Sequence, residues 1–331
     1  MMSRQFWKEF AIASDAKLAD SCLSIFPATS TLLIFLFHSL FESAEEAARG
    51  VMDPQQAVTA EMFHGFVATL HEHGYRFVSP EDIVAGLDPA GRYAMITFDD
   101  GYANNFRALA TLEEFHAPAV FFIASNQVLT GKPFWWDVLY REMQKRGQPA
   151  DNPGGACAAL KRLRTCEAEE QIIAAFGSAA FQTVSDIDRP FTAAELATFA
   201  RHPLVHIGNH TADHAILTNY RPDEVREQIG RAQESLEAIT GRVPAMIAYP
   251  NGNVSRAALE AANEAGLRLG VTARAGRNTI PSTRSRTRAL LLKRYTLWGN
   301  RDLAAQCRIA RSPLSLQTAW AAIRSKAIFT A

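Results

Sequence analysis

Residues 94–124 read AMITFDDGYANNFRALATLEEFHAPAVFFIA, and the fold can be built outward from this stretch. It begins with a short apolar run, continues with apolar residues at helical spacing over Asn104–Phe115, and ends in a second apolar run, Ala119–Ala124. Strand, helix and strand in this order form a unit in which the helix crosses between two parallel strands. The stretch therefore predicts a parallel α/β sheet.

The same alternation continues in both directions along the chain. Helices are predicted at about Thr59–His73 and Pro222–Thr240, each followed by a glycine that can end it. Strands are predicted at Leu32–Phe37, Arg76–Val78, Ala94–Phe98, Ala119–Ala124, Leu204–Ile207, Ala245–Tyr249, Leu267–Thr272 and Leu290–Leu297. Because about seven or eight such units close into a barrel, we expect an α/β fold with a barrel of about seven strands.

One segment, at about 146–190, interrupts this alternation. It begins with QPADNPGG and continues as an alanine-rich helical sequence, which predicts an inserted helical lobe. We therefore expect an N-terminal extension (1–30), a barrel (31–300) that carries the insertion, and a helical tail (301–331). The arginine-rich stretch Arg274–Arg288 is typical of a solvated loop, or alternatively of a contact for an anionic glycan.

Charge and composition restrict the partners. The 34 basic residues balance 34 acidic ones, so no overall field attracts nucleic acid, and a neutral sugar or small molecule remains open as a substrate. The longest apolar run, Leu32–Phe37, is far shorter than the about 20 residues of a membrane span. Four scattered cysteines exclude a cysteine-rich zinc site. We expect no integral membrane segment and a cytoplasmic location, while the oligomeric state stays open.

Two adjacent carboxylates, Asp99 and Asp100, directly follow the predicted strand Ala94–Phe98. Successive residues point in different directions, so one carboxylate can bind a metal while the other faces the water that the metal activates. Asp–Gly by itself is also the signal of an ordinary turn. Ligand sites of parallel α/β folds lie at the carboxyl ends of the strands, which favours a functional interpretation.

Two histidines, His210 and His214, follow the predicted strand Leu204–Ile207. On a helical backbone residues four apart share a face, and two imidazoles with one carboxylate form a three-ligand metal site with open positions. A lone pair at this spacing is also typical of a surface helix. Asp213 between them could orient a ligand, or it is an acidic residue at a helix start, which we favour.

A third motif, Tyr249-Pro250-Asn251 followed by glycine, comes after the strand Ala245–Tyr249. Proline and glycine fix a turn that can present a backbone N–H to a developing oxyanion. Alone, this pattern indicates only a turn.

Taken together, TFDDGY, HTADH and AYPNG, in this order and spacing, resemble the polysaccharide deacetylase family, the homology group of chitooligosaccharide deacetylase (nodulation protein B). The resemblance runs from about Leu32 to Leu297 and includes LLIFLFHSL, PAVFFIA and FWWD. It implies a distorted (β/α) barrel.

The resemblance also implies roles for individual residues. Asp99 matches the general base of the family, and Asp100, His210 and His214 match its divalent-metal ligands. Asn251 occupies the place whose backbone N–H helps to hold the oxyanion. Zinc is the expected ion for an Asp–His–His set, although such sites also accept cobalt, nickel or manganese.

Two departures from the family pattern concern the remaining groups. The third motif has Ala248 where the family usually has arginine, and no histidine follows His214, although many members carry a late histidine that protonates the departing amine. Some exported poly-N-acetylglucosamine deacetylases have this acid at the end of the first strand, where His38 stands here. His38 is therefore either the general acid or a packing residue at a strand end.

Trp135 and Trp136 begin a predicted helix after Pro133. Their rings could stack on pyranose rings of a substrate, or they pack the inserted lobe. Asp137, the next residue, could polarise a site histidine or solvate the helix start.

We therefore expect a metal-dependent hydrolase of carbon–nitrogen bonds other than peptide bonds. Its carbohydrate substrate would be an N-acetylated amino sugar of the chitooligosaccharide or poly-N-acetylglucosamine type, and no nucleic acid partner is expected. One alternative is a hydrolase of a small non-sugar amide or cyclic imide. The other is a non-catalytic glycan-binding protein. It is favoured because both the arginine of the third motif and the late histidine are missing.

Overall fold

The structure is a computed structural model that describes residues 4–25, 30–148, 155–279 and 286–314. Within these residues one eight-stranded parallel sheet has the order β7-β6-β5-β4-β3-β1-β8, with β2 added on β3. The parallel α/β fold is thereby confirmed. The strands are β1 (Thr31–Phe37), β2 (Arg76–Phe77), β3 (Arg92–Phe98), β4 (Ala119–Ile123), β5 (Val205–Asn209), β6 (Met246–Ala248), β7 (Leu269–Val271) and β8 (Tyr295–Thr296).

The segment that leads into β8 brings the two ends of the sheet together. Leu292 forms a parallel bridge with Val271 of β7, and the amide of Thr272 donates to the carbonyl of Leu292 at 2.9 Å. A few residues later β8 pairs with β1, where Tyr295 lies opposite Phe35. The sheet therefore closes into the distorted barrel that was predicted, with its last join made by two short pairings.

The predicted strand Leu290–Leu297 is wrong as a continuous strand, and the break has a structural cause. The chain pairs with β7 near Leu292 and with β1 only from Tyr295 onward. Between these pairings the Lys293 amide donates to the side chain of Asn278 at 2.9 Å, and the Arg294 amide donates to a loop carbonyl. The chain thus changes neighbour at Lys293–Arg294, which turns the Arg294 side chain inward, toward the carboxyl end of β3.

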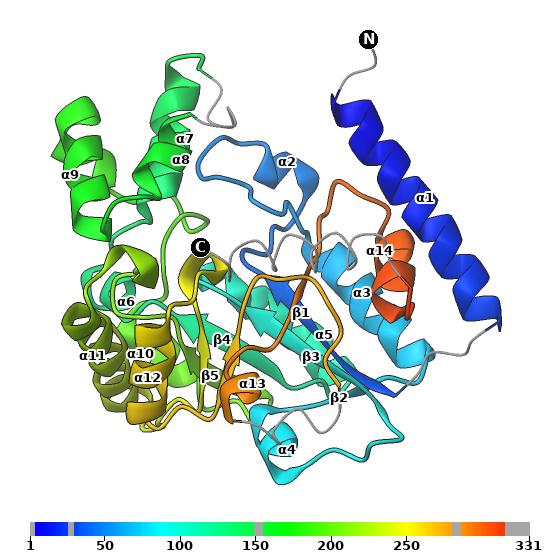
Figure 1. The fold of residues 1–331 in the computed structure, drawn as a ribbon. Coiled ribbons are helices and arrows are strands. Elements are labelled where there is room, and N and C mark those ends of the chain that lie inside the picture. The colour runs from blue at the N-terminus through cyan, green and yellow to red at the C-terminus, as the bar shows by residue number, and fades with distance from the viewer. Residues whose placement is uncertain (1–3, 26–29, 149–154, 280–285, 315–331) are drawn as a thin grey trace.

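Helices surround the barrel (Figure 1). Helix α11 (Pro222–Thr240) has the predicted bounds, whereas the predicted helix Asn104–Phe115 is divided into the 3₁₀ helix η1 (Ala103–Ala108) and α5 (Leu109–Glu114). The other α-helices of the described residues are α1 (Arg4–Ile25), α2 (Ala44–Ala47), α3 (Ala60–Glu72), α4 (Pro80–Ala85), α6 (Ser125–Thr130), α7 (Trp135–Lys145), α8 (Ala156–Leu160), α9 (Thr165–Phe176), α10 (Ala193–Phe199), α12 (Arg256–Glu264), α13 (Arg286–Ala289) and α14 (Leu303–Arg311). Three further 3₁₀ helices are η2 (Ser178–Phe181), η3 (Leu217–Asn219) and η4 (Pro250–Gly252).

Contacts between phenylalanine rings fix the positions of β1, β3 and β4 relative to one another along the barrel axis. The Phe98 ring of β3 stacks on the Phe121 ring of β4 with centroids 4.8 Å apart, and on the Phe37 ring of β1 with centroids 5.3 Å apart. Such aromatic contacts stabilise packing beyond the area they bury. Because β1, β3 and β4 are locked to each other in this way, the residues that follow them are placed at one end of the barrel.

The segments outside the barrel alternation form two groups. Figure 1 shows α7, α8 and α9 together, apart from the barrel helices; α8 and α9 lie within the predicted insertion, whereas α7 precedes it. At the other side α1 packs along α14, where Asp20 and Arg308 form an ion pair at 2.9 Å. The predicted limits of the extension, lobe and tail stay predictions, and residues 315–331 of the tail lie outside the described residues.

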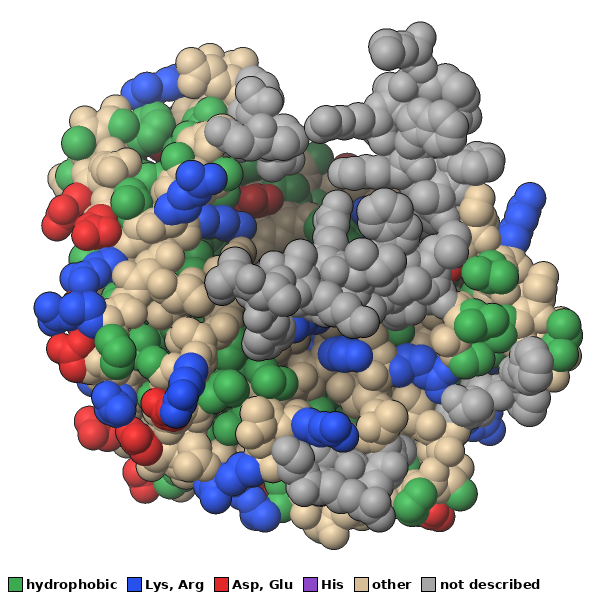
Figure 2. Space-filling view, viewed as in Figure 1, with side chains coloured by type: hydrophobic (Ala, Val, Ile, Leu, Met, Phe, Trp, Pro, Cys, Tyr) green, Lys and Arg blue, Asp and Glu red, His purple; other side chains and the backbone are tan. Residues whose placement is uncertain are grey.

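The surface agrees with the balanced composition. On the face in Figure 2, basic and acidic side chains both occur among uncharged ones. Among the described helices, none is long and apolar enough to cross a membrane.

Candidate active site

Asp99 and Asp100 stand at the carboxyl end of β3, and the backbone directs them differently. The Asp99 amide donates to the Phe37 carbonyl at 2.9 Å, which extends the ladder between β1 and β3 by one residue. Asp100 has a left-handed backbone with φ 77°, and Gly101 follows with φ 92°. This change of conformation separates the directions of the two carboxylates, as their adjacency predicted.

His210 and His214 come from a loop after β5, so the helical backbone assumed for their spacing is wrong. Thr211 and His214 both have positive φ, 65° and 50°, and the Thr211 amide donates to the Asn209 side chain at 2.8 Å. These two reversals turn both imidazoles toward Asp100 without a helix. The rings lie edge-to-face with centroids 4.7 Å apart.

Asp213 in the same loop contacts neither imidazole. Its amide donates to Gln228 of α11 at 3.0 Å, and its carboxylate accepts hydrogen bonds from Gln228 and from Asn126 of α6. The prediction of a helix-start acid is wrong, because no helix begins there. Asp213 instead fastens the loop to two helices.

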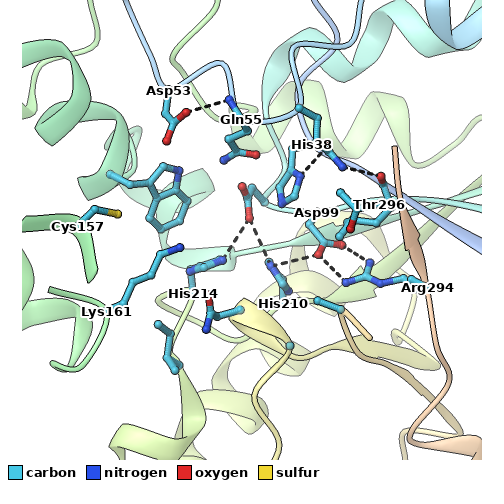
Figure 3. A pocket seen from close by; sticks show the side chains of 18 of the residues that line it. His38, Asp53, Gln55, Asp99, Cys157, Lys161, His210, His214, Arg294 and Thr296 are labelled. Carbon is cyan, nitrogen blue, oxygen red and sulfur yellow. Dashed lines mark hydrogen bonds and ion pairs between the residues drawn. The ribbon is translucent and has the colours of Figure 1, made fainter. Parts of the chain in front are cut away.

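Asp100, His210 and His214 converge as a metal-ligand set would. The Nε2 atoms of both histidines lie 3.3 Å from Asp100 Oδ1, and the three potential ligand atoms lie within 4.8 Å of one another (Figure 3). Both Asp100 oxygens are buried without a hydrogen-bond partner among the described residues. His210 Nδ1 faces the Ala248 carbonyl at 2.8 Å, which assigns the proton to Nδ1 and leaves the Nε2 lone pair toward Asp100. Two acceptors aimed at each other fit a cation between them.

The charges of this cluster favour the ionised carboxylate. Burial raises the pKa of Asp100, but His38, His210 and His214 outweigh it and hold that pKa well below its ordinary value. Burial also lowers the pKa of His214, which favours the neutral imidazole that a metal requires.

Asp99 is paired with Arg294, a residue that the sequence interpretation missed. Arg294 Nη1 and Nη2 donate to Asp99 Oδ1 and Oδ2 at 2.7 and 2.8 Å, and Nη1 also donates to Thr97 Oγ1 at 3.1 Å. Burial raises the pKa of Asp99, but the Arg294 guanidinium, with His210 and His38, outweighs burial, so the net direction of the pKa is downward. The absence of an arginine at Ala248, together with the arginine in the late strand, is the signal that could have found this pair.

His38 follows β1 and lines the same cavity. Its Nδ1 lies 2.9 Å from Gln56 Oε1, and its backbone carbonyl accepts a hydrogen bond from Asn105 Nδ2 at 2.7 Å. Gln56 is a second residue that the sequence interpretation missed.

Trp135 and Trp136 line the cavity from the start of α7. The Trp136 ring lies 4.4 Å from the His214 ring, and its Nε1 donates to Tyr102 Oη at 3.1 Å. Tyr102 in turn donates to Asp137 at 2.7 Å. Asp137 therefore neither contacts a site histidine nor solvates the helix start; it is buried and anchors Trp136 through Tyr102.

The third motif contributes Asn251 and Gly252 to the cavity wall. Asn251 has φ 58° and lines the cavity, whereas the Tyr249 side chain is buried in an apolar cluster with residues of β6, α11 and α12. Pro250 is buried and begins the short turn η4. Neither Tyr249 nor Pro250 lines the cavity, so the motif presents Asn251 through its turn.

One cavity of about 300 Å³ is lined by His38, Asp99, Asp100, Trp135, Trp136, His210, His214, Asn251 and Arg294. The barrel supplies its polar floor, and the lobe supplies one wall through Trp135, Trp136, Cys157 and Lys161. Figure 3 shows Cys157 and Lys161 on one side and Arg294 and Thr296 on the other, with His38, Asp99, His210 and His214 between these two sides. The volume is that of a small ligand pocket.

The matched sequence region covers the three motifs. A model of the family described as polysaccharide deacetylase matches residues 87–270, more than half of the chain. The chain belongs to the polysaccharide deacetylase family. His38 and Arg294 both lie outside the matched residues, one before and one after them.

Individual relatives are distant. YxkH of Bacillus subtilis (strain 168), which is named for the same family, is 19% identical over 224 residues, which make up 66% of this chain and 60% of that protein. The deacetylase PplD of Streptococcus pyogenes, solved with acetate, superposes with a TM-score of 0.57 at 18% identity, over 85% of this chain and 99% of that chain. A de-N-acetylase from Aggregatibacter actinomycetemcomitans gives 0.57 at 16% identity, over 85% and 100%. These structures share the fold.

Proposed function

We propose that this protein is a metal-dependent hydrolase that removes the N-acetyl group from N-acetylated amino sugars in an oligosaccharide or polysaccharide. The observation that carries the proposal is the separation of two adjacent carboxylates into different environments. Asp100 faces two histidines, whereas Asp99 is held by Arg294 beside them. Such a division provides a ligand and a base from one strand end.

Asp100, His210 and His214 would hold the ion, and zinc suits this donor set. When bound, such an ion supplies Lewis acidity that polarises the amide carbonyl and makes water more acidic. The chain itself contributes the fixed orientation of the ligands: the Ala248 carbonyl sets His210, and the Trp136 ring packs beside His214.

Asp99 is proposed as the general base that accepts a proton from the attacking water. Arg294 fixes its carboxylate with two hydrogen bonds and keeps it ionised despite burial. The water oxygen then forms a bond with the amide carbon, and the backbone N–H of Asn251, at the cavity wall, is proposed to donate to the oxyanion.

His38 is proposed as the general acid, because an amine leaves an amide only when it gains a proton. It lies in the same cavity as Asp99 but comes from another strand end. The imidazolium would give its proton to the amine nitrogen as the carbon–nitrogen bond breaks.

The lobe wall supports a sugar substrate. Trp135 and Trp136 present aromatic surface to a cavity whose floor carries the reacting groups, an arrangement suited to a pyranose ring. The glycan identity, for which we propose a chitooligosaccharide or poly-N-acetylglucosamine type, and the cytoplasmic location stay predictions.

The test uses the zinc-loaded chain with chitooligosaccharides and with poly-N-acetylglucosamine oligomers. Mass spectrometry of the sugar and an acetate assay should show one acetate released for each acetyl group lost. Asp99→Asn in parallel excludes a contaminating activity. Binding of the sugars without acetate release would favour the non-catalytic glycan-binding protein. Hydrolysis of small non-sugar amides alone would favour the hydrolase of a small amide or cyclic imide.

A further inference from the structure

The side chain of Gln56 makes two hydrogen bonds that assign the orientation of its amide. Gln56 Nε2 donates to the Leu36 carbonyl at 2.8 Å, and Oε1 lies 2.9 Å from His38 Nδ1. A carbonyl can only accept, so the nitrogen of the amide must face Leu36 and the oxygen must face His38. Because an amide oxygen also only accepts, the proton of the contact lies on Nδ1 of His38.

The loop that carries Gln56 is built around this contact. Gln56 is 4% exposed and stands between Gln55 and Ala57, which both have left-handed backbone, with φ 47° and 51°. Non-glycine residues in this conformation are uncommon and persist where their surroundings enforce them. The contact that holds this loop in its conformation is a hydrogen bond from the Gly299 amide to the Gln56 carbonyl, at 2.7 Å.

Gly299 has to be glycine for this approach. A Cβ atom at Gly299 would lie 2.0 Å from the Ala57 carbonyl oxygen, so any side chain there would push the loop away. The loop after β8 therefore presses Gln56 toward the end of β1. Since Asn105 holds the His38 carbonyl, the histidine is fixed both at its backbone and at Nδ1.

We propose that Gln56 is a positioning residue that keeps His38 in the Nδ1–H tautomer and aims Nε2 into the cavity. This inference rests on the proposed function of His38 as the general acid. Nε2 is then the nitrogen that gives its proton to the departing amine. The neutral ring that remains keeps its other proton on Nδ1, where it is hydrogen-bonded to Gln56 Oε1. Because the Gln56 side chain is a neutral amide, it fixes the His38 ring without placing a negative charge beside the ring.

The test reads the tautomer directly in the zinc-loaded full chain labelled with ¹⁵N-histidine. Two-bond ¹⁵N–¹H spectra at a pH where the ring is neutral distinguish Nδ1–H from Nε2–H, and His38→Gln assigns the signals. We expect Nδ1–H in the wild type, the same tautomer in Gln56→Glu, whose carboxylate also accepts, and loss of the single tautomer in Gln56→Met. An Nε2–H ring in the wild type, or an unchanged tautomer in Gln56→Met, would overturn the proposal.

A stability control separates this role from packing. Gln306 is also buried, and it accepts from the Trp298 amide and donates to the Trp298 carbonyl, both at 2.9 Å. Gln306→Met should therefore lower the unfolding temperature about as much as Gln56→Met does, yet leave the His38 signals unchanged. A change in the His38 tautomer in Gln306→Met would assign the effect to general loosening and overturn the proposal.

The rate measurement uses a double-mutant cycle. Gln56→Met should slow amide hydrolysis about tenfold or more, the scale of a lost positioning contact, and should add nothing to His38→Gln. Losses that multiply in full would mean that Gln56 acts elsewhere. If His38→Gln itself leaves the rate unchanged while the tautomer is as expected, the proposed acid fails and the tautomer assignment stands.

Discussion

The guanidinium of Arg294 and the carboxylate of Asp99 form a buried pair with two parallel hydrogen bonds, although 195 positions separate them in the sequence. Asp99 follows β3, and Arg294 stands where the chain leaves β7 and joins β1 through β8. Through this pair the segment that leads into β8 contacts Asp99, the proposed base. Both the position and the charge of Asp99 therefore depend on Arg294.

Replacing Arg294 should shift the pH dependence of the reaction. In Arg294→Gln the burial that raises the pKa of Asp99 remains, and the guanidinium that lowers it is gone. Because the base acts only when it is deprotonated, the acidic limb of kcat/KM against pH should move to higher pH, and activity at neutral pH should fall at least tenfold. Part of the loss should be recovered as the pH rises.

Arg294→Lys serves as the matched control, because it keeps the charge but not the two-pronged geometry. Its acidic limb should move less than that of Arg294→Gln, while its maximal rate still falls. An acidic limb at the wild-type pH in Arg294→Gln would show that Arg294 does not set the charge of Asp99. Circular dichroism should accompany both variants, since breaking a buried pair costs about 3–5 kcal/mol of stability.

Replacing His38 should affect substrates according to their leaving groups. His38→Gln should retain metal and fold but lose about a hundredfold in amide hydrolysis, the scale of a lost general acid. An acetyl ester with an activated leaving group needs less protonation, so its loss should be much smaller. Equal losses on amide and ester would assign His38 a positioning role, and no loss on either would leave it a packing residue.

The metal prediction concerns the histidine loop. Elemental analysis should find about one divalent ion per chain, a chelator should abolish activity, and zinc should restore it. His214→Ala should lose most of the bound ion. His206→Ala is the matched control, because His206 lies in β5 but pairs with Glu81 at 3.0 Å, away from the cluster. Full metal content in His214→Ala would contradict the ligand assignment.

A stability prediction concerns the turn after Asp100. Gly101 has φ 92°, and a Cβ there would lie 2.9 Å from Ile123 Cδ1. Gly147 has φ 66° but no neighbour within 4 Å. Gly147→Ala should cost about 1 kcal/mol for the left-handed backbone alone, and Gly101→Ala about 1–3 kcal/mol more for the contact. Urea unfolding measures both, and equal costs would contradict the close packing of this turn.

The longer strands of the barrel could be predicted because most of their residues are apolar and buried on both faces. In β1 all seven residues are buried, which is the pattern that a parallel strand requires. The break before β8 could not be predicted in this way. Leu290–Leu297 begins with three leucines and ends with another, and it divides at Lys293–Arg294, where the chain leaves β7 for β1.

The site was predictable where residues stand next to each other and less so where backbone reversals place them. Asp99 and Asp100 could be separated by adjacency alone. The turns at Thr211 and His214 have positive φ without glycine, for which local sequence gives little signal. Arg294 and Gln56 reach the site through long-range contacts, and neither stands in a motif.

The most direct test of the central claim compares Asp99→Asn with Asp100→Asn, measuring zinc content and deacetylation rate on the same samples. The claim is that two adjacent carboxylates have different tasks, so the two variants should differ in metal content although both are inactive. Asp99→Asn should keep about one zinc per chain and lose about a hundredfold or more in rate, whereas Asp100→Asn should lose most of its zinc. Loss of zinc in Asp99→Asn, or full zinc in Asp100→Asn, would contradict the division between base and ligand.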